Sequence, residues 1–199
     1  MKLKHYTLNI SKIVFFISLL YLTLILPLLF TIYSPIWYNF NYESQEITKS
    51  INIEQRDNAT SNLIHYFAYN TDLNSLWNEK EKIHMSEVRT IYLFLEVLTL
   101  IAILLLFFTF DKSLILKYTK INIIIISSLL ILIPFFSFLF NSVFHFILFD
   151  NNFWIITPED ISYYLFPNSF FKNSFLLIII ISIIENVVIY FFSKKYFKD

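Results

Sequence analysis

Residues 141–171 read NSVFHFILFDNNFWIITPEDISYYLFPNSFF, and this stretch changes from apolar to amphipathic along its length. Its first residues complete an apolar run that contains His145, and Asp150, Asn151 and Asn152 then interrupt that run. The tetrad at 157–160, Thr-Pro-Glu-Asp, favours a helix start, with Thr as N-cap and Pro at the first helical position. We therefore expect a short helix over residues 158–166, ending before Pro167.

Aromatic side chains are concentrated in the second half of this stretch. Rings of this kind suit a segment that lies at a membrane surface, where their apolar bodies are half buried. Such a segment, held over the ends of membrane helices, could receive a lipid, although the outer loop of any small membrane protein can have this composition. The rings are Tyr163, Tyr164, Phe166, Phe170 and Phe171.

The composition of the whole chain indicates a membrane protein. Of the 199 residues, 57% are hydrophobic and 20% are aromatic, more apolar surface than a soluble domain of this length needs. Lys+Arg and Asp+Glu both total 15, so the charge gives no reason to expect nucleic-acid binding. The absence of cysteine excludes disulfides, thiol nucleophiles and thiolate metal sites. The absence of glycine excludes glycine-rich phosphate loops, the dinucleotide fingerprint and the nucleophile elbow.

Four apolar runs are long enough to cross a bilayer. The first is followed by Tyr-Ser-Pro rather than by a small-residue cleavage site, so we interpret it as a retained transmembrane helix and not as a signal peptide. The expected transmembrane helices are residues 13–32, 91–110, 121–140 and 174–192.

Two long polar loops, residues 33–90 and 141–173, separate these runs. In the first loop, residues 39–42 and 47–53 alternate between apolar and polar side chains, which favours two short strands. A helix is expected to begin near Ser75 and to continue into the second apolar run.

The distribution of lysines predicts the orientation in the membrane. Positive charge is concentrated on the cytoplasmic side of membrane proteins, so the two termini and the short middle loop are expected to be cytoplasmic and both long loops to face outward. The expected fold is an all-α membrane protein: four transmembrane helices with two extracytoplasmic loops that carry short interfacial helices. The lysines are Lys2, Lys4, Lys12, Lys112, Lys117, Lys120, Lys194, Lys195 and Lys198.

Two histidines at the ends of apolar runs are the candidate acid–base residues. His84 stands about two turns before the second run, and on a helix Glu81 and Glu87 share its face. His145 lies about one turn beyond the third run. If the second and third spans pack together, as their short connection suggests, the two imidazoles meet at one membrane depth. Imidazole near neutral pH can both accept and donate a proton.

Other interpretations of these polar residues remain open. A lone interfacial histidine is usually just an amphipathic residue at a wet boundary. Glu81-x-x-His84 also has the spacing of a metal-ligand pair in helical bundles, but a di-metal bundle needs two such pairs and this chain has one, so we expect no metal. Glu96 and Glu185 lie inside apolar runs, where acids are costly and usually functional, and their roles stay open.

The order of these motifs resembles a known family, the small bacterial four-span membrane proteins that include the lipoprotein intramolecular transacylase. The first motif is Glu81-x-x-His84-Met85-x-Glu87-Val88, just before the second span. The second is Phe144-His145 with Asp150 and Trp154 after it, and the third is Asp160 followed by Pro167 and Phe170-Phe171. The chain departs from the family in having Glu87 where Asp is usual, and Asn168 where an acid is common.

This resemblance implies an acyl transfer in the membrane of a bacterial cell. The substrate would be a lipoprotein whose N-terminal cysteine carries a diacylglyceryl group. One acyl chain would move to the cysteine α-amine and give the N-acyl lyso form, and membrane lipid would be a further partner. No cofactor is implied, since amine and ester belong to one molecule. The implied catalytic residues are His84 and His145; the implied positioning residues are Glu81, Glu87, Asp150, Trp154 and Asp160.

Two other classes of function remain at this stage. In the first, the chain is a non-catalytic scaffold or transporter subunit, and Glu96, Glu185 and Asn186 line an interface with partner helices. In the second, it is a metal-dependent membrane hydrolase that uses His84, His145 and nearby acids.

Overall fold

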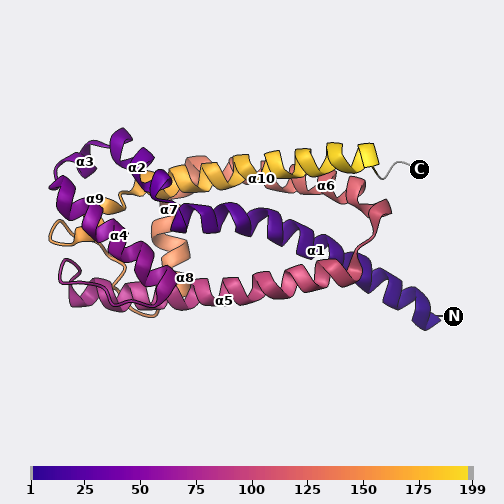
Figure 1. The fold of residues 1–199 in the computed structure, drawn as a ribbon, viewed down its shortest axis with the longest axis horizontal. Helices are drawn as coiled ribbons and strands as arrows, with labels where there is room; N and C mark the ends of the chain where they lie inside the picture. The colour runs from indigo at the N-terminus through magenta and orange to yellow at the C-terminus, as the bar shows by residue number, and fades with distance from the viewer. Residues whose placement is uncertain (1, 197–199) are drawn as a thin grey trace. The chain divides into compact units, whose positions relative to one another are not determined.

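The structure, a computed structural model, describes residues 2–196 and the side chains of residues 10–196. Every regular element in this part of the chain is a helix (Figure 1). Four helical stretches are long and apolar enough to cross a membrane, and the protein is therefore a multi-pass membrane protein. They are α1 (Lys2–Tyr33), apolar from Ile10 on, α5 (Glu79–Thr109), the segmented stretch Lys112–Leu148, and α10 (Asn168–Tyr196).

The expected short strands at 39–42 and 47–53 are wrong, because this part of the first long loop is helical. It contains α2 (Pro35–Ser44), α3 (Glu46–Lys49) and α4 (Ile53–Tyr69). Pro35 occupies the first turn of α2, where its missing N–H costs nothing. The buried side chains of α2 then follow the period of a helix, and a four-residue alternation is too short to override that pattern. They are Trp37, Tyr38, Asn41 and Tyr42.

The chain forms two compact units. The first contains Met1–Leu28, Phe94–Ile131 and Leu176–Asp199, and the second contains Leu29–Leu93 and Leu132–Phe175.

The first unit is held together by ring packing and by buried polar contacts. Phe15 is buried, and its ring centroid lies 5.8 Å from that of Tyr118. Asn122 of α6 (Lys112–Ser128) donates to Asn186 of α10 at 3.2 Å, and both side chains are fully buried. Side-chain amides that bond across helices are a usual means of association where water is absent. Asn186 therefore contacts a helix of its own chain.

The second unit contains the start of α5 and the short helices of both long loops. Tyr38 of α2 packs against Phe170 of α10 with ring centroids 5.5 Å apart, and Phe67 of α4 packs against Tyr92 of α5 at 5.2 Å. Trp37 donates from Nε1 to Ser174 Oγ at 2.8 Å. These contacts join the first long loop to the beginnings of two membrane helices.

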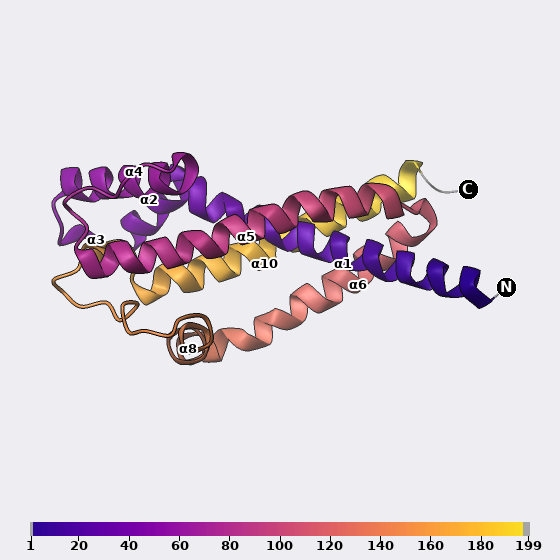
Figure 2. The same ribbon diagram turned by 90° about the horizontal axis from the view of Figure 1, so that it is seen from below.

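The third membrane stretch changes its winding several times after α6. A 3₁₀ segment, η1 (Leu129–Phe135), contains Pro134, which cannot donate to the ordinary helical ladder. It is followed by α7 (Phe136–Phe138), a π-helical turn η2 (Leu139–Phe144) and α8 (His145–Leu148), which is seen end-on in Figure 2.

The expected helix at 158–166 exists, but it is shorter and begins differently. It is α9 (Ile161–Leu165), and Asp160 rather than Thr157 occupies its N-cap position. Thr157 and Asp160 instead close a turn, in which Asp160 N donates to Thr157 O at 2.9 Å. The Thr157 hydroxyl donates to Asp160 Oδ2 at 3.0 Å, whereas the hydroxyl of an N-cap threonine would accept from a backbone N–H of the first turn. The helix ends before Pro167, as expected.

Candidate functional site

His84 is placed by the way in which α5 begins. Glu81 N donates to Asn78 Oδ1 at 2.9 Å, and Asn78 N donates to Glu81 Oε2 at 3.0 Å. This reciprocal pair is a capping box, which satisfies two free N–H groups and fixes the first turn of the helix. His84 follows one turn later with 8% of its surface exposed.

His145 is placed by the π-helical turn that precedes it. Its Nδ1 lies 2.6 Å from the carbonyl oxygen of Phe140, five residues earlier. Because a carbonyl oxygen only accepts, Nδ1 must carry the proton in this contact. The neutral ring therefore presents Nε2 as an unprotonated acceptor. A π-helical turn is an unusual feature that is frequent at functional sites.

The two imidazoles face each other inside an aromatic enclosure. Their ring centroids are 6.3 Å apart, and both side chains are buried. Phe149 contacts His84 at 4.8 Å and His145 at 5.8 Å, and Trp154 stacks on His145 at 4.8 Å. The indole is itself held, since Nε1 of Trp154 donates to Asn151 O at 2.8 Å. The sequence-based expectation that the two rings lie close together thus agrees with the geometry.

Glu87 is the carboxylate that lies near His84. Its Oε2 is 3.7 Å from His84 Nδ1, which is too long for a hydrogen bond but close for an electrostatic contact. Its Oε1 accepts from Asn151 Nδ2 at 2.6 Å. Glu87 thus joins α5 to the loop that carries Trp154.

Glu81 has a different set of partners from the one that its spacing suggested. Besides the cap at Asn78, it accepts at Oε1 from Ser162 N at 2.8 Å and from Ser162 Oγ. The two contacts with Ser162 fasten the start of α5 to α9, and the contact with Asn78 stays within the cap of α5. The contacts of Glu81 are therefore with the walls of the site, whereas Glu87 faces His84.

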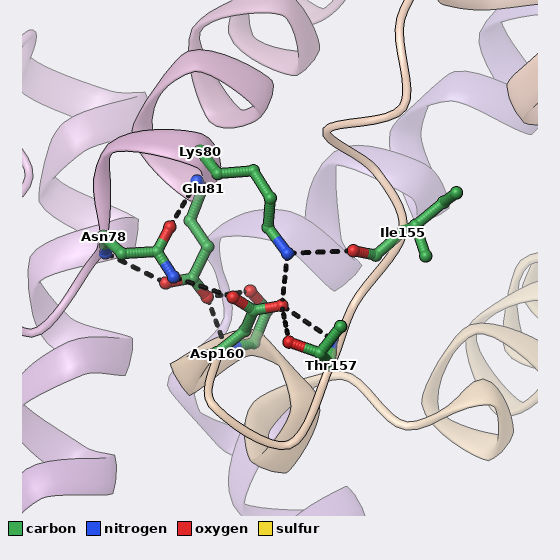
Figure 3. Close-up of polar contacts among 7 residues, drawn as sticks. Asn78, Lys80, Glu81, Ile155, Thr157 and Asp160 are labelled. Carbon is green, nitrogen blue, oxygen red and sulfur yellow. Dashed lines mark hydrogen bonds and ion pairs between the residues drawn. The ribbon is translucent and has the colours of Figure 1, made fainter.

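Asp160 is the centre of a second polar cluster, drawn in Figure 3. Its Oδ1 accepts from Asn78 Nδ2 at 2.7 Å, and its Oδ2 lies 2.6 Å from Lys80 Nζ and accepts from Thr157. Lys80 also donates to Ile155 O at 3.0 Å. Burial alone would raise the pKa of the Asp160 carboxyl, but the hydrogen bonds from Lys80, Thr157 and Asn78 lower it below its ordinary value.

The structure does not bring Asp150 to this site. Its side chain is exposed at the end of α8, and it makes no hydrogen bond or ion pair with any residue that the structure describes. It is also not among the residues that line the cavity described next.

The histidines border a cavity of about 420 Å³ that lies within the second unit. A cavity of this size lies within the usual range of small-molecule binding sites. Its walls are mainly aromatic and aliphatic, with a few polar side chains between them. The lining residues are Ile47, Lys80, Glu81, His84, Met85, Phe140, Asn141, His145, Phe153, Trp154, Ile155, Ile156, Asp160, Ser162, Tyr163, Phe166, Pro167, Asn168 and Phe171.

Four polar residues that the sequence-based prediction missed belong to this site. Asn78 could have been found, since Asn-x-x-Glu before an apolar run is a capping-box signature. Lys80 could have been found as the residue one turn before His84 on the same face. Asn151 and Ser162 had no such signal, because their partners are more than sixty residues away in the sequence. Within the described residues, no group of three or more His, Asp or Glu side chains is arranged to hold a metal ion.

Comparisons with known proteins identify the fold and the family of the chain. No curated protein matches the chain in sequence. Solved structures of the membrane-integral lipoprotein intramolecular transacylase from Bacillus cereus match its fold. One has a TM-score of 0.85 at 17% identity, covering 96% of each chain. A histidine-to-alanine variant of that protein matches with a TM-score of 0.80 at 16% identity, covering 98% of this chain and 95% of the other.

The match to a family model covers most of the chain. The model of the family described as lipoprotein intramolecular transacylase Lit matches residues 13–171. This range includes both histidines and the whole lining of the cavity. The chain therefore belongs to the lipoprotein intramolecular transacylase family.

Proposed function

We propose that this protein moves one ester-linked acyl chain of a diacylglyceryl lipoprotein to the α-amine of its N-terminal cysteine, with His84 and His145 as the acid–base pair. The family gives the reaction. The observation that supports the site is that the two buried imidazoles lie with ring centroids 6.3 Å apart and border the same cavity.

The chemistry needs no nucleophile from the enzyme. The amine nitrogen attacks the ester carbonyl carbon, and the carbonyl π electrons move to oxygen. The tetrahedral oxyanion then collapses, the C–O bond to glycerol breaks and the C–N bond remains. One proton leaves nitrogen and one reaches the glycerol oxygen, so the reaction consumes no water and no cofactor. Holding amine and ester together supplies much of the rate, and proton transfer supplies the next part.

His145 is the better placed base. Its Nδ1–H is held by the Phe140 carbonyl, so Nε2 is the nitrogen that is free to take the amine proton. His84 lines the same cavity and would donate a proton to the leaving glycerol oxygen. The proton that His145 takes from the amine then replaces the proton that His84 has donated. Glu87 Oε2 lies 3.7 Å from His84 Nδ1, too far for a hydrogen bond but close enough to favour a positive charge on that ring.

Three of the remaining predicted residues position the His145 ring or the walls of the cavity. Trp154 fixes the plane of the His145 ring by stacking on it. Glu81 and Asp160 hold the walls of the cavity through α9 and the loop before it. Asp150 has no contact that supports such a role.

We propose the bacterial cell membrane as the location, with both termini and the α5–α6 connection cytoplasmic and both long loops outside. The lysine distribution supports this orientation. An outward site would face the leaflet in which mature lipoproteins are anchored, and membrane lipid would surround the acyl chains.

The test is expression in a bacterium that makes only diacyl lipoproteins. Because the acyl chain moves within one molecule, the mass of the N-terminal lipopeptide does not change. The product is therefore identified by fragment ions that carry the acyl group on the amine, and by loss of the free amine. Lipopeptides that keep a free amine in cells containing the folded protein would refute the proposed function. Nothing among the described residues favours the scaffold or the metal-dependent hydrolase.

A further inference from the structure

Lys80 lies on the rim of the reaction cavity, one turn before His84 on α5. Residues four apart share a helix face, so the two side chains lie on one side of α5. The Lys80 ammonium contacts Asp160 Oδ2 at 2.6 Å and donates to Ile155 O at 3.0 Å (Figure 3). The lysine side chain is 30% exposed, whereas that of Asp160 is 3% exposed. Asp160 and the Ile155 carbonyl therefore hold the ammonium in place, and the partly exposed Lys80 side chain lines the cavity.

An ammonium group carries three N–H donors, and two of those of Lys80 have partners within the described chain. The third is left for a ligand in the cavity. Two contacts from different segments also hold the nitrogen in place before any substrate binds. A donor held in this way costs no reorganisation when charge develops next to it.

The proposed reaction passes through an oxyanion, which a positively charged donor stabilises more strongly than a neutral one. Asn141, Tyr163 and Asn168 also line the cavity and carry neutral donors. Ser162 donates its hydroxyl proton to Glu81, and Trp154 donates its indole N–H to a backbone carbonyl. Glu81 and Asp160 are acceptors when ionised. Among the residues that line the cavity, Lys80 is the only lysine or arginine.

We infer that Lys80 is a third catalytic residue, whose ammonium binds the carbonyl oxygen of the migrating acyl group as that oxygen becomes negative. Asp160 is then a positioning residue for the ammonium. The inference rests on the proposed function, since only acyl transfer creates this oxyanion. Loss of one oxyanion donor typically lowers kcat about 10²–10³-fold. Replacement of a positioning residue typically costs about 10–100-fold.

A purely structural role for Lys80 is the rival explanation. By bonding to Ile155 O, the side chain also holds the residue next to Trp154, which stacks on His145. The charge of the side chain separates the two roles. A tether needs N–H donors of the right length, whereas an oxyanion needs a positive charge as well.

The chain offers a clean way to vary this charge alone, because it contains no cysteine. The variant Lys80→Cys has a single thiol, which is alkylated in detergent before substrate is added. Bromoethylamine restores an ammonium at the length of lysine. Iodoacetamide gives a neutral amide of the same length that keeps N–H donors. The rate of conversion of a synthetic diacylglyceryl lipopeptide is measured for each form, together with the thermal unfolding midpoint.

We expect Lys80→Cys to lower kcat about 10²–10³-fold, the ammonium form to regain most of that loss, and the amide form to regain little. Equal recovery of kcat by both adducts would show that Lys80 has only a structural role. Full activity of unmodified Lys80→Cys would show that Lys80 takes no part in the reaction. Failure of both adducts at a normal unfolding midpoint would also overturn the inference. If Lys80→Cys does not fold, Lys80→Arg should be more active than Lys80→Gln. The reverse order would refute the inference that a positive charge at residue 80 stabilises the oxyanion. Wild-type protein that converts no substrate would overturn the proposed function itself.

Discussion

Replacing Glu81 by glutamine tests whether this carboxylate acts through the fold of the site. Glu81 is 3% exposed, and its two oxygens accept from three donors: Ser162 N, Ser162 Oγ and Asn78 N. In Glu81→Gln one oxygen becomes an NH₂ group that must face a donor. The least costly rotamer places the amide nitrogen toward Asn78, which breaks the capping box and leaves the two bonds to Ser162 without charge assistance.

The expected cost follows from these contacts. Loss of a cap costs about 0.5–2 kcal/mol, and a hydrogen bond to a charged group contributes about 1.5–3 kcal/mol against about 1 for a neutral one. Because Glu81 N still donates to Asn78 Oδ1 in the variant, we take the lower half of each range, which gives a sum of about 2–3 kcal/mol for the cap and the two bonds. For a chain of this length we expect the thermal unfolding midpoint in detergent to fall by about 5–10 °C. Conversion should fall with it, since α9 and the start of α5 both border the cavity.

The matched control is Glu79→Gln, the same substitution two residues earlier. The Glu79 side chain is 84% exposed and pairs with Lys82 on the helix surface, a contact worth at most about 1 kcal/mol. Its midpoint should stay within about 4 °C of wild type. A Glu81→Gln midpoint equal to that of Glu79→Gln would refute the assignment of Glu81 to the α5–α9 junction.

Three further predictions concern the acid–base pair, acid stability and topology. His84→Ala and His145→Ala should each lower the rate of lyso-lipoprotein formation about 10²–10⁴-fold, while His65→Ala, on α4 outside the cavity, should change it little; lipopeptide fragmentation measures all three. The folded-state pKa of Asp160 is depressed, so its contact with Lys80 stabilises the protein above the unfolded pKa and is lost as pH falls through the folded pKa. The unfolding midpoint of wild type should therefore fall more between neutral and acid pH than that of Asp160→Asn. Equal falls in the two proteins would contradict the prediction. Reporter fusions in the α5–α6 connection and at the C-terminus should report the cytoplasm, and one in the α3–α4 connection should report the outside; a C-terminus outside would reverse the orientation.

The large features of the fold could be predicted from the sequence because they depend on local composition. Four apolar runs give four long helices whatever their neighbours are. The helical face shared by His84 and Glu87 follows from spacing alone, and the two side chains are indeed neighbours. The short strands failed because a few alternating residues carry little information, and burial of Trp37 and Tyr38 on one side of a helix decided the matter.

The direction in which the His145 side chain points could not be predicted, because it depends on the winding of the preceding helix. The π-helical turn Leu139–Phe144 adds a residue to one turn, and each residue of an α-helix advances the side chain by about 100°. No residue in that turn signals the extra residue, since it contains neither proline nor glycine. The turn is fixed by ring packing in the folded protein, such as Phe140 against Phe171 with centroids 4.4 Å apart. A regular α-helix would have pointed His145 elsewhere.

The site and the stability of the second unit depend on the same ten residues. Between Asn78 and Glu87, the chain supplies the cap of α5, the anchor of α9, the ammonium of Lys80 and one of the two histidines. Five of these positions bond to the loop between α8 and α9 or contact α8 and α9 themselves, so this segment of α5 holds the loop that carries Trp154. Substitutions at the start of α5 should therefore change activity and stability together, whereas Trp154 lies outside this segment and stacks on His145. The ratio of lost activity to lost stability then separates residues that build the cavity from residues that act on the substrate within it.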